Sequence, residues 1–190
     1  MNCLYKISGK DGNIIWRLGG KLTNFDLDPA AEFANQHDAR WVDDKKQDQI
    51  TILDNGPHGD VSYSRGLLLA VDQSAKAVRL VTEFRNGPST FGQFEGSLQP
   101  INPGDPNTNF MVGYGLQPYF TEFSSNGTVL LDGQFGTASA VNSYRTYKLP
   151  WQGKPLNKPS INWEASTGKV HLSWNGATDH EKWVSRMKLL

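Results

Sequence analysis

The side chains best suited to chemistry are a histidine and a few arginines that flank short apolar runs. His37 opens such a run, and imidazole suits nucleophilic and acid–base work because its charge changes near neutral pH. The other histidines fit less well: His58 lies in a loop of Gly, Pro and Asp, His171 alternates against an apolar row, and His180 lies in the polar tail. His37 is therefore the candidate reactive residue, and a structural histidine bonded to a neighbouring loop is the alternative.

Arginine suits an anion with several oxygens because its planar fork can bind two oxygens at once. Arg65 follows a polar loop and precedes a continuously apolar run, so its head is expected at a strand edge, where it could meet His37. A surface arginine paired with an acid is the alternative. Arg40 and Arg145 carry weaker versions of the same argument.

Short strands must position these side chains, because one unit recurs: an apolar strand, a turn of Gly and polar residues, and a second strand. The hairpin turns lie near Gly12, Ala75, Gly127 and Gly168, roughly 50 residues apart, and two more strands fit between successive hairpins. The expected strands cover 4–7, 14–18, 37–42, 49–54, 65–71, 77–84, 96–101, 109–114, 118–123, 128–131, 161–165 and 169–174. This order predicts an all-β chain of propeller-like blades, with a β-sandwich as the alternative.

Helix is expected at two places only. Asp28 followed by Pro29 predicts one or two helical turns over residues 28–35. In the tail, Thr178–Glu181 has the capping-box spacing, and the local pattern favours a helix behind it.

Composition excludes several classes of protein. Lys plus Arg and Asp plus Glu each number 19 in 190 residues, so the net charge is zero. Binders of nucleic acid or of anionic membrane surfaces normally carry a basic excess, so neither partner is expected. The mean hydropathy is −0.52. No stretch approaches the about 20 apolar residues of a membrane span. Cys3 alone makes no internal disulfide, and the first residues show no secretory signal pattern.

Several short motifs, taken together and in order, resemble the arylsulfotransferase family, and its fungal branch is the most similar. The motifs are Trp16–Gly20, Gln36–Arg40, Leu53–Gly56, Ser64–Leu67, Ser143–Arg145, Pro150–Pro155 and Ser173–Thr178. The resemblance implies a β-propeller of about six blades, of which this chain would supply about three over residues 1–160, from the C-terminal part of the domain. Residues 161–190 would form a truncated, β-rich C-terminal segment, with strand to about Trp174 and the last dozen residues left open.

The resemblance also implies a reaction. A sulfuryl group would pass from a phenolic sulfate ester to a phenol through a transient sulfohistidine, with no nucleotide donor, cofactor or metal. His37 would attack sulfur and Arg65 would hold the sulfonyl oxygens. The side chains that would bind substrate are Arg40, Asn55, Gln99, Tyr114 and Arg145. For Asn55 a role in the turn at 54–57 is the favoured interpretation, and for Gln99 a buried amide bonded to backbone is the alternative. For Tyr114 a place in the core is the favoured interpretation.

The chain departs from the family pattern in its histidines. The bacterial enzymes are understood to use several histidines from different blades, whereas no histidine lies between His58 and His171 here. A non-catalytic binding or interaction module is therefore the alternative function. Open sheet edges in a partial propeller would also favour self-association. Secretion is implied by the family and fits the glycosylation sequon at Asn126, although the chain shows no signal peptide.

Overall fold

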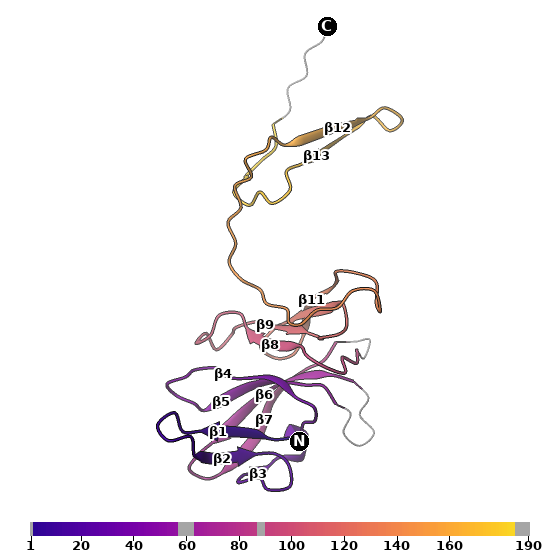
Figure 1. The fold of residues 1–190 in the computed structure, drawn as a ribbon. Helices are drawn as coiled ribbons and strands as arrows, with labels where there is room; N and C mark the ends of the chain where they lie inside the picture. The colour runs from indigo at the N-terminus through magenta and orange to yellow at the C-terminus, as the bar shows by residue number, and fades with distance from the viewer. Residues whose placement is uncertain (1, 57–62, 87–89, 185–190) are drawn as a thin grey trace. The chain divides into compact units, whose positions relative to one another are not determined.

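The computed structural model describes residues 2–56, 63–86 and 90–184 (Figure 1), and the chain divides after Lys148 into two compact units. Each unit is described by itself. Regular structure in the described ranges consists of strands and one turn of 3₁₀-helix, η1 (Pro29–Ala31). The all-β prediction is confirmed, while the domain boundary after residue 160 stays a prediction.

Two antiparallel meanders, each of four strands in chain order, form most of the larger unit (Figure 1). The first contains β4 (His37–Trp41), β5 (Gln49–Asp54), β6 (Arg65–Asp72) and β7 (Ala77–Phe84). The second contains β8 (Ser97–Pro100), β9 (Phe110–Gly113), β10 (Tyr119–Phe123) and β11 (Val129–Gln134). A hairpin of β1 (Leu4–Ile7) and β2 (Ile14–Leu18) precedes them, and β3 (Asp26–Leu27) pairs in parallel with β7. Such meanders are typical of propeller blades, but the described strands close into neither a propeller nor a barrel.

Local turn chemistry explains why these strands were predictable. Every expected strand is present, and β1, β2, β5 and β7 have the predicted bounds. The expected helix over residues 28–35 is the single turn η1, where the Asp28 Oδ1 atom accepts a hydrogen bond of 3.0 Å from the Ala30 amide. The structure adds β3, which is too short to show a periodic pattern and pairs with a strand far along the chain.

The first meander is covered on both faces, which explains its continuously apolar strand β6. Leu67 and Leu69 face one buried cluster with Trp16 and Leu18 of the β1–β2 hairpin, whereas Leu68 faces a second cluster. Alternation along a strand sends successive side chains to opposite faces. The second cluster joins the two meanders, and its other buried members are Leu53, Phe84, Leu98, Phe110, Val112, Tyr114 and Phe123. The larger unit is thus built from stacked sheets with apolar layers between them.

Tyr114 belongs to this second cluster and is fully buried, so its ring lies in the core. Burial raises the pKa of Tyr114 to about 12. The pKa of tyrosine in the unfolded chain is about 10. The stability that the protein gains by keeping this phenol neutral is therefore fully present below about pH 10 and is lost as the pH rises through about 12. Between about pH 9 and pH 11, we expect wild type to lose about 1 kcal/mol more unfolding free energy than Tyr114→Phe, as measured by urea titration. Equal losses in the two proteins would contradict this.

Between residues 149 and 184, the smaller unit forms a hairpin of β12 (Ser160–Glu164) with β13 (Lys169–Ser173). The strand expected to about Trp174 is confirmed. Residues 174–184 contain no helix, and the remainder of the helical pattern lies outside the described residues. No helix in the described part of the chain is long and apolar enough to cross a membrane.

Candidate functional site

A bulge in β4 shapes the site around His37. The pairing of β4 with β5 shifts between His37, opposite Leu53, and Arg40, opposite Thr51. Asp38 lies within this shift with a φ of 54°, in the left-handed region that asparagine and aspartate tolerate better than most residues. The Asp38 side chain is only 1% exposed at this bulge. Its carboxylate accepts hydrogen bonds from the Arg40 guanidinium and the Tyr147 hydroxyl.

Two arginines converge on the Asp38 carboxylate. The Arg40 Nε atom lies 2.7 Å and the Arg145 Nη1 atom 3.2 Å from the same oxygen, Asp38 Oδ1. The Tyr147 hydroxyl accepts a 3.1 Å hydrogen bond from Arg40 Nη2 and lies 3.3 Å from Asp38 Oδ2. The hydrogen bond with Asp38 raises the pKa of Arg40 above its already high value. One carboxylate cannot neutralise two guanidinium groups, so this Asp38 cluster carries a net positive charge.

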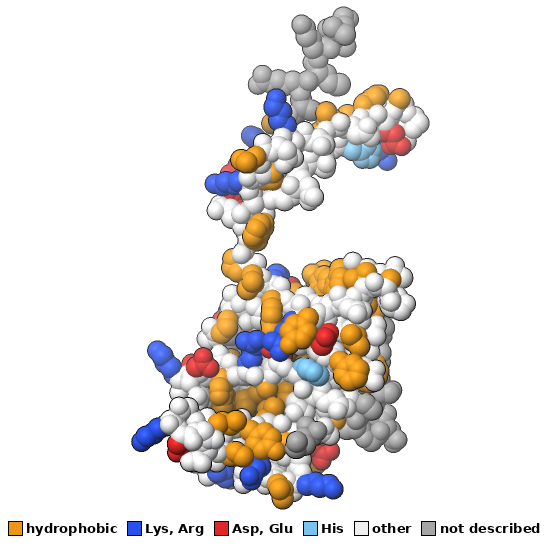
Figure 2. Space-filling model, in the orientation of Figure 1, with side chains coloured by type: hydrophobic (Ala, Val, Ile, Leu, Met, Phe, Trp, Pro, Cys, Tyr) orange, Lys and Arg blue, Asp and Glu red, His pale blue; other side chains and the backbone are white. Residues whose placement is uncertain are grey.

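The guanidinium groups of the Asp38 cluster are not fully paired. The Arg145 Nε atom is buried and has no hydrogen-bond partner among the described residues. The side chains of Arg40 and Arg145 are 55% and 26% exposed, so solvent or a ligand reaches both. Figure 2 shows basic, acidic, histidine and hydrophobic side chains close together on one face of the larger unit. Exposed, paired guanidinium groups of this kind can bind an oxyanion through several charge-assisted hydrogen bonds.

Side-chain hydrogen bonds hold the segment 143–148, which brings Arg145 to Asp38. The Ser97 hydroxyl donates to the Thr146 carbonyl at 2.9 Å and accepts from the Thr146 amide at 3.0 Å. The Gln99 amide donates to the Lys148 carbonyl at 3.1 Å and accepts from the Lys148 amide at 2.8 Å. Gln99 therefore fits the alternative of an amide bonded to backbone, and its contribution to the site is to position Arg145.

His37 is held by two neighbours at the start of β4. Its Nε2 atom accepts a hydrogen bond of 3.3 Å from the Glu95 amide, and its Nδ1 atom lies 2.8 Å from Asn55 Oδ1. An amide N–H can only donate, so Nε2 is unprotonated here and Nδ1 carries the proton given to Asn55. Asn55 is itself buried and donates to the carbonyls of Gly92 and Glu95. Asn55 thus orients the imidazole of His37.

Arg65 lies within the first meander, bonded to acids and backbone. Its guanidinium donates to Asp54 Oδ2 at 2.9 Å, to Glu83 Oε2 at 2.8 Å and to the Glu32 carbonyl at 2.8 Å, and its side chain is 7% exposed. Burial lowers the pKa of Arg65, but the hydrogen bonds to Asp54 and Glu83 outweigh that effect and raise it. This is a paired arginine, as in the alternative above, but it is buried rather than on the surface. Its catalytic role stays a prediction.

The structure thus brings together Arg40 and Arg145 at Asp38, the residue that follows His37 in the chain, and pairs His37 with Asn55. It places Tyr114 in the second apolar cluster and Arg65 on Asp54. Sequence reasoning missed Asp38 and Tyr147. Asp38 stands inside a recognised motif, and Tyr147 lies two residues beyond another, so their positions were a usable signal. No group of three His, Cys, Asp or Glu side chains suited to a metal ion occurs in the described ranges.

The comparisons with known proteins agree with this picture at the level of the family. The sequence model of the family "Arylsulfotransferase (ASST)" matches residues 1–136, which include both meanders, His37 and Arg40. The motifs after residue 136 lie outside that match. No curated protein and no solved structure matches the chain. The match covers well over half of the sequence, and the chain therefore belongs to the arylsulfotransferase (ASST) family.

Proposed function

We propose that this protein binds a phenolic sulfate ester at the Asp38 cluster and transfers its sulfuryl group to a phenol through His37. The observation that supports this most directly is the convergence of Arg40 and Arg145 on the carboxylate of Asp38. Asp38 directly follows His37 in the chain, and the Nε2 atom of His37 is unprotonated. The two guanidinium groups would bind the sulfonyl oxygens and offset the negative charge that develops as the ester bond breaks.

The reaction would proceed in two displacements. His37 Nε2 attacks sulfur, so that an N–S bond forms while the S–O ester bond breaks and the phenolate leaves with the electron pair. The acceptor phenol then gives its proton to solvent and attacks sulfur, so that a new S–O bond forms while the N–S bond breaks and its electron pair returns to Nε2. Before the first step, Nε2 must give up its hydrogen bond from Glu95. At 3.3 Å this bond is longer than the usual 2.9–3.0 Å, so losing it is cheap.

The experiment is an assay of the full chain with 4-nitrophenyl sulfate as donor and phenol as acceptor. We expect phenol-dependent release of 4-nitrophenol and formation of phenyl sulfate, identified by mass spectrometry. If the ester binds but no phenyl sulfate forms, the protein acts as a non-catalytic binding module. If the ester neither binds nor reacts, the proposal is wrong.

The non-catalytic alternative has its own support, because both ring nitrogens of His37 are engaged by Asn55 and Glu95. An imidazole used as a bridge between loops would look the same. The open edges of the sheets also support the proposal that copies of this chain associate. Secretion, and the absence of nucleic-acid partners, are proposals of the same kind.

The Arg145→Gln variant tests the Asp38 cluster. Removing one guanidinium removes charge-assisted hydrogen bonds worth about 1.5–3 kcal/mol, so we expect the affinity for 4-nitrophenyl sulfate to fall about 10- to 150-fold. Isothermal titration calorimetry measures the change. Arg79→Gln is the matched control, because Arg79 pairs with Asp26 and both side chains are more than half exposed. Equal affinities in both variants would place the ester elsewhere.

A further inference from the structure

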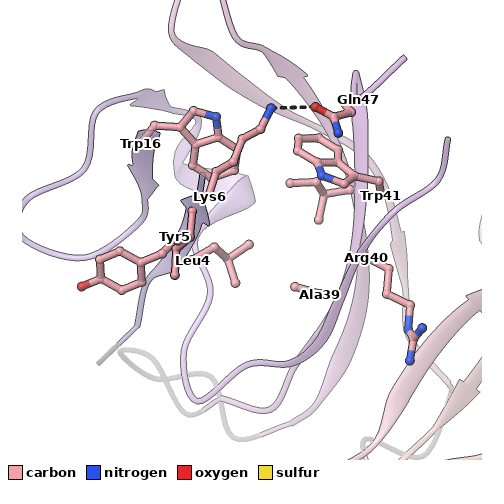
Figure 3. A pocket seen from close by; sticks show the side chains of 10 residues that line it. Leu4, Tyr5, Lys6, Trp16, Ala39, Arg40, Trp41 and Gln47 are labelled. Carbon is pink, nitrogen blue, oxygen red and sulfur yellow. Dashed lines mark hydrogen bonds between the residues drawn. The ribbon is translucent and has the colours of Figure 1, made fainter. Parts of the chain in front are cut away.

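A pocket of the larger unit lies between β1 and β4 (Figure 3). The charged groups of the Asp38 cluster do not point into it. Its volume is about 370 Å³, within the range of small-ligand pockets. It is lined by Leu4, Tyr5, Lys6, Ile7, Trp16, Ala39, Arg40, Trp41, Gln47 and Ile50. Arg40 lines one wall, but its guanidinium points away from the two tryptophans in Figure 3 and bonds to Asp38.

Two tryptophan rings form the aromatic part of this pocket. Trp16 and Trp41 meet edge to face with ring centroids 6.1 Å apart. Trp16 is held rigidly, because it packs edge-on against Phe25 and its Nε1–H donates to Gln73 Oε1 at 3.0 Å. Trp41 is only partly buried and offers ring surface to the pocket. A planar ring can pack against such a surface at little conformational cost to the protein.

Lys6 supplies a positive charge beside these rings. Its ammonium donates to Gln47 Oε1 at 2.6 Å and to Gln73 Oε1 at 2.9 Å, and it lies 5.6 Å from the Trp41 ring centroid. Amide oxygens orient an ammonium group but do not neutralise it. None of the lining residues is acidic, and Asp43 in the adjoining loop accepts backbone bonds instead. The pocket therefore holds a fixed cation with no acidic side chain among the described residues that line it.

The backbone that presents Gln47 is strained. Gln47 has a φ of 52°, a left-handed conformation that few residues other than glycine, asparagine and aspartate adopt. The Gln73 side chain donates to the Gln47 carbonyl at 2.9 Å, which helps to hold this arrangement. Strained residues of this kind cluster at binding sites, where the surrounding contacts maintain them.

We propose that this pocket binds a planar aromatic anion, with the ring against Trp41 and the anionic group at the Lys6 ammonium. A neutral ring would not use the uncompensated charge, and an anion without a ring would not use the tryptophans. The inference concerns binding alone and does not rest on the sulfuryl transfer proposed above, because its ligand groups lie outside the Asp38 cluster.

The probe is 2-naphthalenesulfonate, a planar aromatic anion with no ester to transfer. Calorimetric titration of the full chain near neutral pH should show binding, whereas methanesulfonate, which lacks the ring, and 2-naphthol, which lacks the charge, should bind at least about tenfold more weakly. Binding of all three ligands with equal affinity would overturn the proposal.

Variants then locate the site. Lys6→Gln and Trp41→Leu should each weaken 2-naphthalenesulfonate binding about tenfold or more, while Lys6→Arg, which keeps the charge, should retain most of it. Because the Asp38 cluster can itself bind an aryl sulfonate, these variants are measured both alone and in an Arg145→Gln background, and the tenfold losses are expected in that background. Circular dichroism establishes that each variant is folded. If Arg145→Gln abolishes binding while Lys6→Gln does not, the anion binds at the Asp38 cluster and the proposal is wrong.

Discussion

Replacing Arg65 by Met is expected to lower the free energy of unfolding by about 3–5 kcal/mol, because the change removes the guanidinium counter-charge of the buried Asp54 carboxylate. The Asp54 side chain is completely buried, and Arg65 is its cationic partner at 2.9 Å. The same guanidinium also bonds to Glu83 and to the Glu32 carbonyl, so one substitution disturbs contacts among three parts of the larger unit. Urea titration followed by tryptophan fluorescence measures the loss.

Arg79→Met is the control for this prediction. Arg79 makes an ion pair of 2.6 Å with Asp26, but both side chains are largely exposed, and such pairs contribute about 0–1 kcal/mol. Equal small losses in the two variants would show that the Arg65 network does not stabilise the fold. If Arg65→Met keeps full stability and loses sulfuryl transfer, the catalytic role predicted for Arg65 gains support.

The second large effect is expected on turnover. His37→Gln should reduce the rate of phenyl sulfate formation by about 10³-fold or more, because glutamine supplies no nucleophile to form the sulfuryl intermediate. Binding of the ester should remain, since Arg40 and Arg145 are unchanged. Initial rates with 4-nitrophenyl sulfate measure the first effect, and calorimetry measures the second.

His171→Gln is the matched control, because His171 lies in the smaller unit with a side chain that is 59% exposed. Its rate should equal that of wild type. Mass spectrometry of the wild-type chain after mixing with donor alone should reveal one added sulfuryl group, which His37→Gln lacks. Full turnover in His37→Gln would show that His37 is not the nucleophile and would favour the bridging role between Asn55 and Glu95.

Most of the strands could be predicted because their signals are local. Alternating apolar residues around turns such as Ser124–Gly127 define a hairpin within a short stretch of chain. β3 could not be predicted, because it pairs with β7 about 50 residues later through only two residues. At Thr178–Glu181 the local signal is present but the structure is not. The capping-box pattern favours a helix, yet residues 178–184 are exposed and form none, because a short helix needs packing against other residues to be stable.

The site was predictable in its residue types but not in its geometry. Arg40 and Arg145 could be named as anion-binding candidates, but their meeting point depends on a contact across more than one hundred residues and on a bulge at Asp38. Arg65 was expected with its head at a strand edge because alternation alone does not show which acids lie beside it. Its burial follows from Asp54 and Glu83, which the neighbouring strands β5 and β7 supply.

The attachment of segment 143–148 to β8 has a thermodynamic consequence. Side chains of Ser97 and Gln99 hold the segment together with two backbone hydrogen bonds, from the Gly96 amide to the Tyr144 carbonyl and from the Ser143 amide to the Gly115 carbonyl. None of these bonds belongs to the β8–β9 ladder, so local opening of the segment would leave that ladder intact. Detachment would carry Arg145 away from Asp38. An anion held jointly by Arg40 and Arg145 would therefore stabilise the attached state, and its observed affinity would contain the docking equilibrium of the segment. Binding of the anion and attachment of segment 143–148 would then be thermodynamically linked.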